Sequence, residues 1–202
     1  MTSSKRERYG VIALRWWSDL QSRRADGTRN PTGNPGALAE LRRVATSVEA
    51  AEHDAAIGLF DRLFPGRSAS DFGRLVRVGT LASILAHVRD HDKPGDGRWP
   101  SVARAVGQQS NGDSARLSPL RFRRLLAARS DDEILTSFRR LVSLAGRRLN
   151  VIDLAESTLE WNDDEIGDRR RVRWAFDYYN AGNATPGATI TNPSPVVSEQ
   201  TS

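Results

Sequence analysis

The stretch SPLRFRRLLAARSDDEILTSFRRLV, residues 118–142, indicates two consecutive amphipathic helices with arginines beside their apolar faces. In the first helix, Phe122, Leu125 and Leu126 fall within an arc of about 100° at helical spacing, which predicts a face turned toward a core. Ser118, followed by a proline, is typical of a helix start. Three basic side chains flank the apolar arc: Arg121, Arg123 and Arg124.

A second helix is expected to begin at Ser130, because Ser130 and Glu133 have the spacing of a capping box. The apolar residues that follow keep the spacing of a buried helical face, and Gly146 is typical of a helix stop. On this pattern Arg139 lies at the edge of the buried face, and Arg140 points away from it.

Composition bounds the class of protein. The 202 residues carry 30 basic and 25 acidic side chains, a net charge of +5, and no cysteine. A chain of this length buries a core without disulfides, and the lack of cysteine excludes zinc fingers of the cysteine type and thiol nucleophiles. No apolar run approaches the roughly 20 residues that span a bilayer, and the N-terminus lacks a secretory signal, so we expect a cytoplasmic protein with no membrane contact.

Basic charge is concentrated in one part of the chain. Residues 96–150 hold 11 arginines against 5 acidic residues, whereas residues 151–180 hold 4 arginines against 8 acidic residues. Apart from Lys5 and Lys93, every basic residue is arginine, which suits forked contacts with phosphate, although the codon usage of a GC-rich genome accounts for most of that bias. The distribution, more than the net charge, favours a polyanionic partner.

Helical periodicity recurs along the chain, and no segment alternates convincingly as a strand does. We therefore predict an all-α fold of two small helical bundles joined by a loop-rich connection. The expected divisions are an N-terminal helical domain over 1–95, an interdomain loop with a short helix over 96–117, a C-terminal bundle over 118–180 and a disordered tail over 181–202.

Aromatic and apolar residues give more local expectations. Because Trp16 and Trp17 are adjacent, they are not expected to point into one core, and we expect one in the core and the other on a contact surface between domains or subunits. A helix over 36–48 is expected to turn Val44 and Val48 inward. The last helix is expected to take Asp163, Asp164 and Glu165 into its first turn, with apolar side chains along it at Ile166, Val172, Phe176 and Tyr179.

Catalysis is not expected. His87 and His91 stand four residues apart, but the sequence signals no third metal ligand and lacks the glutamate of a zinc hydrolase helix, so we interpret them as surface histidines. The acidic clusters at 131–133 and 163–165 occupy predicted helix starts, where the helix dipole explains them. The sequence shows no phosphate-binding glycine loop and no nucleophile elbow, so we predict no cofactor, no metal and no enzyme activity.

The motifs RWWSDL, ALAELRR, PSVARAVG, RFRRLL, FRRLV and LEW, in this order, resemble the small subunit of the type I-E CRISPR Cascade complex, the CasB family. The resemblance runs from about residue 9 to 179. It implies a non-catalytic, two-domain helical protein that serves antiviral defence as a pair of copies among other Cascade subunits, next to crRNA and target DNA. Such a subunit is expected to bind DNA or RNA without reading sequence and to hold the displaced strand of an R-loop.

Within the matching motifs the resemblance implies a set of nucleic-acid-binding residues: Arg42, Arg43, Arg104, Arg121, Arg123, Arg124, Arg139 and Arg140. Their chemistry alone adds Arg77, Lys93 and Arg129. Two other functions remain open. One is a helical transcription regulator that places a basic helix in a major groove. The other is a purely structural adaptor that uses surfaces at Trp16, Trp17 and Trp161.

Overall fold

The computed structural model describes residues 8–24, 26–66, 71–92, 101–110 and 114–181. The prediction of an all-α fold is confirmed. The described chain forms ten helices and two small two-stranded sheets, in the order α1 (Tyr9–Leu20), α2 (Pro35–Arg43), α3 (Ser47–Ala51), α4 (Asp54–Leu63), α5 (Phe72–Ala86), β1 (Asp90–His91), α6 (Val102–Gly107), β2 (Gln109–Ser110), β3 (Ser114–Ala115), α7 (Pro119–Ala127), α8 (Asp131–Leu144), β4 (Arg148–Leu149), α9 (Val151–Glu160) and α10 (Gly167–Tyr179).

Helix α5 organises the N-terminal half. Its residues from Val78 to Ala86 are all buried, because α2, α3 and α4 pack around it on one side and α8 and α9 on the other. The contact with α3 is close. A Cβ on Gly79 would lie 2.5 Å from the backbone nitrogen of Ala51, so only glycine lets these two helices approach to this distance.

An aromatic cluster fills the C-terminal half. Phe138 of α8 meets Trp161 with ring centroids 5.0 Å apart and Trp174 of α10 at 5.3 Å. The indole nitrogen of Trp174 donates a hydrogen bond to the hydroxyl of Ser157 at 2.9 Å. The predicted capping box is confirmed at the start of α8, where the side chains of Ser130 and Glu133 each accept a hydrogen bond from the backbone of the other's position.

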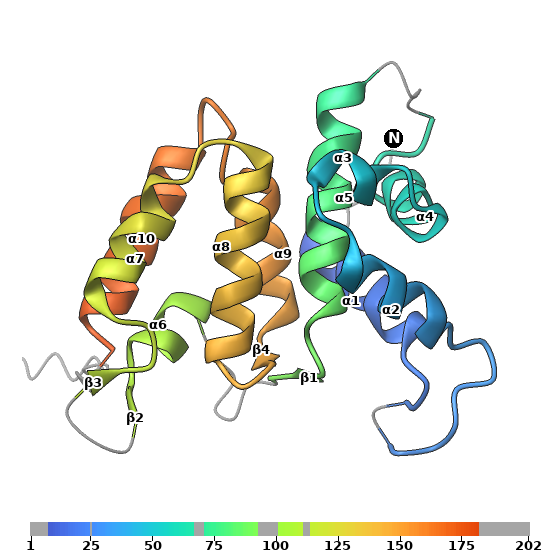
Figure 1. The fold of residues 1–202 in the computed structure, drawn as a ribbon, viewed down its shortest axis with the longest axis horizontal. Helices are drawn as coiled ribbons and strands as arrows, with labels where there is room; N and C mark the ends of the chain where they lie inside the picture. The colour runs from blue at the N-terminus through green and yellow to red at the C-terminus, as the bar shows by residue number, and fades with distance from the viewer. Residues whose placement is uncertain (1–7, 25, 67–70, 93–100, 111–113, 182–202) are drawn as a thin grey trace, which may run out of the picture.

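The two halves lie side by side (Figure 1), and their buried apolar side chains form one cluster. Helix α1 packs against α9, α5 packs against α8 and α9, and β1 pairs in parallel with β4 in the register Asp90 to Arg148 and His91 to Leu149. Helix α6, inside the segment expected to connect the domains, packs against α10. None of the described helices combines the length and the hydropathy needed to cross a membrane.

The tryptophan expectation is wrong. Trp16 and Trp17 are both buried, at 3% and 7% relative exposure, because α1 lies between two layers of the fold. The Trp16 indole donates to the carbonyl of Ala55 on one side, and the Trp17 indole donates to the carbonyl of Val88 on the other. Trp161 is fully buried as well, so none of the three tryptophans offers a contact surface.

Two predicted helices have other boundaries. The helix expected over 36–48 stops at Arg43, because Thr46 accepts a hydrogen bond from the backbone N–H of Glu49 and begins α3; Val44 is buried as expected, but Val48 is exposed. The acidic cluster at 163–165 precedes α10, since Asp163 closes a turn by accepting from the backbone of Glu165 and Ile166.

Candidate nucleic-acid interface

Three arginines from distant parts of the sequence meet where the two halves of the chain join. Arg42 lies in the last turn of α2, Arg89 follows the end of α5, and Arg147 follows the end of α8. The Nε atom of Arg42 donates to the carbonyl of Ala86 at 2.6 Å, which holds this side chain against the end of α5. Cations are favoured near the carboxyl ends of helices, where the helix dipole is negative. We call Arg42, Arg89 and Arg147, together with the neighbouring His87, the seam cluster.

A tight turn after α8 positions Arg147. Gly146 and Arg147 both have positive φ, 73° and 64°, a conformation that glycine adopts freely and arginine rarely. The turn is held from the N-terminal half, because the carbonyl of Arg147 accepts hydrogen bonds from the backbone N–H of Arg89 at 2.8 Å and of Asp90 at 3.2 Å. The same contacts bring the Arg89 and Arg147 backbones together.

The positive charges of the seam cluster lie close together. Burial lowers the pKa of Arg42, and the charges of Arg147 and Arg89 lower it further. Burial also lowers the pKa of His87 to about 4, helped by the charges of Arg139, Arg42 and Arg147. In the part of the chain that the structure describes, no carboxylate forms an ion pair with Arg42, Arg89 or Arg147. These cations are therefore available to an external anion.

Arg139 points into the junction of the two halves. Its guanidinium donates to the carbonyl of Val44 at 2.9 Å, to the carbonyl of Leu41 at 3.2 Å and to the hydroxyl of Ser83. Burial lowers its pKa. These contacts join α8 to α2 and α5, so Arg139 stabilises the packing of the two halves. Its charge also acts on His87 of the seam cluster.

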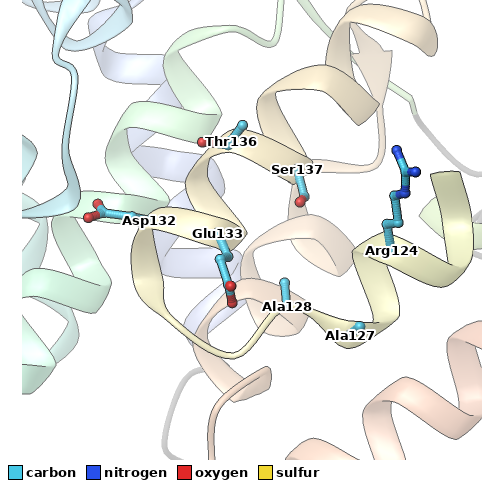
Figure 2. A pocket seen from close by; sticks show the side chains of 7 residues that line it. All are labelled: Arg124, Ala127, Ala128, Asp132, Glu133, Thr136 and Ser137. Carbon is cyan, nitrogen blue, oxygen red and sulfur yellow. The ribbon is translucent and has the colours of Figure 1, made fainter.

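The predicted arginines of α7 form a second basic surface. Arg121, Arg123 and Arg124 are exposed, whereas Phe122 between them is fully buried and stacks on Tyr178 with ring centroids 3.8 Å apart. Figure 2 shows Arg124 rising from α7 beside a groove, with Asp132 and Glu133 projecting from the start of α8. The groove therefore has mixed charge, and the basic surface is the outer side of α7.

Arg77 and Arg129 lie among acidic or carbonyl groups. Arg77 donates to the carbonyl of Asn162 at 3.5 Å, and its charge partly offsets the burial that raises the pKa of Asp131. Arg129 donates to the carbonyls of Leu126 and Ala128, at 2.8 and 3.0 Å, and lines a hollow that contains three aspartates. Neither belongs to the seam cluster.

The remaining candidates are scattered. Arg43 and Arg140 are exposed on α2 and α8, and Arg104 is half-buried on α6. Lys93 lies outside the described residues. Sequence reasoning therefore placed only Arg42 of the three seam arginines among its candidates. It missed Arg89 and Arg147. The feature that they share in the sequence is a basic residue within three positions of a helix end.

The two histidines also differ from expectation, because both are half-buried rather than on the surface. The Nδ1 atom of His91 accepts a hydrogen bond from the backbone N–H of Val151 at 3.2 Å. Within the described ranges, no group of three or more histidine, cysteine, aspartate or glutamate side chains is arranged to hold a metal ion.

Helix α10 carries an exposed apolar face. Val172, Phe176 and Tyr179 are 69%, 67% and 59% exposed, whereas Trp174 and Tyr178 face the core. The sequence pattern predicted Val172, Phe176 and Tyr179 only as apolar side chains along the last helix. The outward stripe of three apolar side chains is a surface suited to another macromolecule.

The fold and the seam cluster define a class: a small all-α protein whose two helical halves share one core and carry an arginine-rich junction. The family model described as CRISPR-associated protein Cse2 matches residues 37–179, and the chain belongs to this family. The resemblance to the small subunit of type I-E Cascade is thereby confirmed.

Solved structures show the same fold. A chain in the crystal structure of E. coli Cascade bound to a PAM-containing dsDNA target superposes with a TM-score of 0.60 at 21% identity, covering 88% of this chain and 98% of that chain. CasB from Thermobifida fusca matches with a TM-score of 0.59 at 20% identity, over 85% and 97% of the two chains. A Cse2-family protein from Thermus thermophilus matches with a TM-score of 0.59 at 23% identity, over 86% and 99%. A sequence search of curated proteins gave no match.

Proposed function

We propose that this protein is a non-catalytic subunit of a crRNA-guided DNA surveillance complex and that its arginines hold nucleic acid irrespective of sequence, stabilising the R-loop and the displaced strand. The observation that carries the proposal is the seam cluster. Arg42, Arg89 and Arg147 come from three separate segments, the charges of the other two lower the pKa of Arg42, and no described carboxylate pairs with any of them.

A sugar-phosphate backbone is the ligand that suits such a cluster. Guanidinium groups replace the counterions around phosphates and form forked hydrogen bonds with them, and these contacts carry no information about base sequence. An opened duplex exposes a single strand, and every phosphate held by the protein lowers the free energy of the open state. Recognition of sequence is then left to pairing between crRNA and the target strand.

The outer face of α7 supports the same function. Arg121, Arg123 and Arg124 are exposed there and are fixed in place by the buried Phe122, so they add a second basic surface on the C-terminal half. We expect Arg121→Ala with Arg124→Ala to weaken binding to DNA while leaving the melting temperature nearly unchanged. A large loss of stability with unchanged binding would show that these side chains are structural.

The partners in this proposal are crRNA, target DNA, other Cascade subunits and a second copy of the chain. The family membership and the likeness to a chain of a Cascade structure with bound DNA support these partners. The exposed stripe Val172, Phe176 and Tyr179 gives a neighbouring subunit apolar area to bury.

The stripe also favours a second candidate function, the structural adaptor. The tryptophans first considered for that role are buried, and the α10 face takes their place. An adaptor would co-purify with its partners and lose no nucleic acid at high salt. A transcription regulator, in contrast, would protect a defined duplex footprint.

The test uses the assembled complex. We would purify the tagged chain from its native cells, identify the co-purifying RNA and subunits, and map the displaced strand of a bound target with permanganate. The proposal predicts short repeat-derived RNA, several protein subunits and a displaced strand that becomes less reactive when Arg42, Arg89 and Arg147 are replaced by alanine, because fewer target duplexes stay open. The matched control is Arg169→Ala, an exposed arginine on α10. Equal reactivity in the triple variant and the control would refute the role of the seam cluster.

A further inference from the structure

A basic cavity lies beside the seam cluster, at the end of α1. It has a volume of about 510 Å³ and is bounded by the loop that follows α1, by the segment after α5 and by β4. Its lining includes Arg23, Arg24, Arg89 and Arg148, with Trp17 and His91. Among the described residues that line it, Asp90 is the one carboxylate. The cavity therefore concentrates positive charge.

The loop that forms one wall is preorganised. Asn30 is buried, and its side-chain amide donates to the carbonyls of Asp19 and Gln21, each at 2.9 Å. Arg23 is bridged to Arg29 across the loop, and its guanidinium donates to the carbonyl of Gly27 at 2.9 Å. Because these contacts hold the loop backbone, binding a ligand requires little additional ordering of the wall.

The opposite wall keeps donors for a ligand. The Nε atom of Arg148 lies 3.4 Å from the carboxylate of Asp92, and its side chain is 67% exposed. A guanidinium has five N–H groups, so this one contact leaves most of them unused. Arg89 is exposed and is shared with the seam cluster. The cavity thus shares one residue, Arg89, with the interface proposed above.

The loop wall of the cavity lies outside the segment that the Cse2 family model matches. Arg23 and Arg24 precede residue 37, where the match to the Cse2 family model begins. The match to the family model therefore does not include this wall.

We propose that this cavity binds a nucleotide phosphate, with its sugar, from a single strand that runs along the seam cluster. The inference rests on the proposed function, because Arg89 belongs to both surfaces. Four guanidiniums on two facing walls suit a phosphate, whose oxygens accept several forked hydrogen bonds at once. The volume accommodates one nucleotide. An internal phosphodiester and the terminal phosphate of a strand both offer such oxygens, so either could be the group that binds.

The test compares matched variants of the full chain. We would measure affinity for a dT12 strand by fluorescence anisotropy for the wild type, Arg24→Ala with Arg148→Ala, and Arg169→Ala. The cavity variant is expected to bind about tenfold more weakly, the effect of losing two partly exposed phosphate contacts, while the control binds as the wild type. A strand with a 5′-phosphate that binds more tightly than its 5′-hydroxyl form identifies a terminal phosphate as the ligand; equal binding identifies an internal one.

Backbone amide spectra give a second readout, one that does not require a DNA strand. Thymidine 5′-monophosphate is expected to shift the amides of residues 21–24 and 89–91, and thymidine is not. If the cavity variant binds dT12 like Arg169→Ala and the monophosphate leaves these amides unshifted, the cavity inference is overturned and the proposed function stands. If the monophosphate shifts them but the wild type does not bind dT12, the proposed function fails and the cavity remains a phosphate site.

Discussion

Arg139→Ala should destabilise the fold, although sequence motifs place this residue among the nucleic-acid ligands. Its guanidinium joins the two halves by donating to the carbonyls of Val44 and Leu41 and to the hydroxyl of Ser83. In the variant the Leu41 carbonyl keeps its hydrogen bond from Ser83, at 2.7 Å, but the Val44 carbonyl loses its donor.

The expected loss of unfolding free energy is about 2–3 kcal/mol. Hydrogen bonds that involve a charged group contribute about 1.5–3 kcal/mol each, and relief from burying the guanidinium offsets part of the loss. For a chain of this size each kcal/mol lowers Tm by about 2–4 °C, so we expect a decrease of about 5–10 °C. Arg139→Lys should fall in between, because an ammonium keeps the charge but not the fork.

Urea unfolding followed by circular dichroism measures the difference. The control is Arg140→Ala, which removes the same charge from the next, exposed position and should change stability by less than about 0.5 kcal/mol. Equal stability of the two variants, with weaker DNA binding only for Arg139→Ala, would refute the structural role. Arg139 would then be a nucleic-acid-binding residue.

Three further predictions concern helix packing, pH and the effect of bound DNA on His87. Gly79→Ala should lower the unfolding free energy by about 1–3 kcal/mol, because its Cβ would clash with the backbone of α3, whereas Gly73→Ala on the same helix meets no atom within 4 Å and should stabilise by about 0.5–1 kcal/mol; thermal melts of both decide this. His87 should lower the free energy of unfolding as the pH falls from 6.5 to 4. Its pKa in the folded protein, about 4, lies below the unfolded value, so the unfolded chain binds more protons in that range. Burial raises the pKa of Asp131 and Asp153, and these two carboxyls therefore change the stability in the opposite direction as the pH falls. The measurement is therefore the difference in stability between the wild type and His87→Gln, and the variant should be less sensitive to acid. An identical pH profile of the two proteins would contradict the assignment. Single-stranded DNA should raise the His87 pKa, which an NMR titration follows, because phosphates would neutralise Arg42 and Arg147 beside it.

The sequence predicted local features well. Helical periodicity and the Ser130 capping box identified α8 with nearly correct ends, because both signals lie within a few residues of each other along the chain. The same reasoning failed at Trp16 and Trp17. Periodicity assigns one buried face to a helix, but α1 is buried on two sides by α4 and by the segment after α5.

The seam cluster is a property of the tertiary structure. Arg42, Arg89 and Arg147 are separated by more than 40 residues from one another and meet only because the ends of α2, α5 and α8 converge. No motif carries such a contact. Arg139 and Arg140 show the converse, because adjacent arginines in one motif have different surroundings: one is hydrogen-bonded inside the junction and the other is exposed.

The salt dependence of single-strand binding tests the seam cluster most directly. For the purified chain and a dT12 strand, the logarithm of the affinity should fall linearly with the logarithm of salt concentration, and each phosphate contact contributes a slope of about −0.7. Replacing Arg42, Arg89 and Arg147 with alanine should make the slope shallower by about 2, whereas Arg169→Ala should leave it unchanged. An unchanged slope in a triple variant that is still folded would contradict the assignment of these arginines to the phosphate backbone.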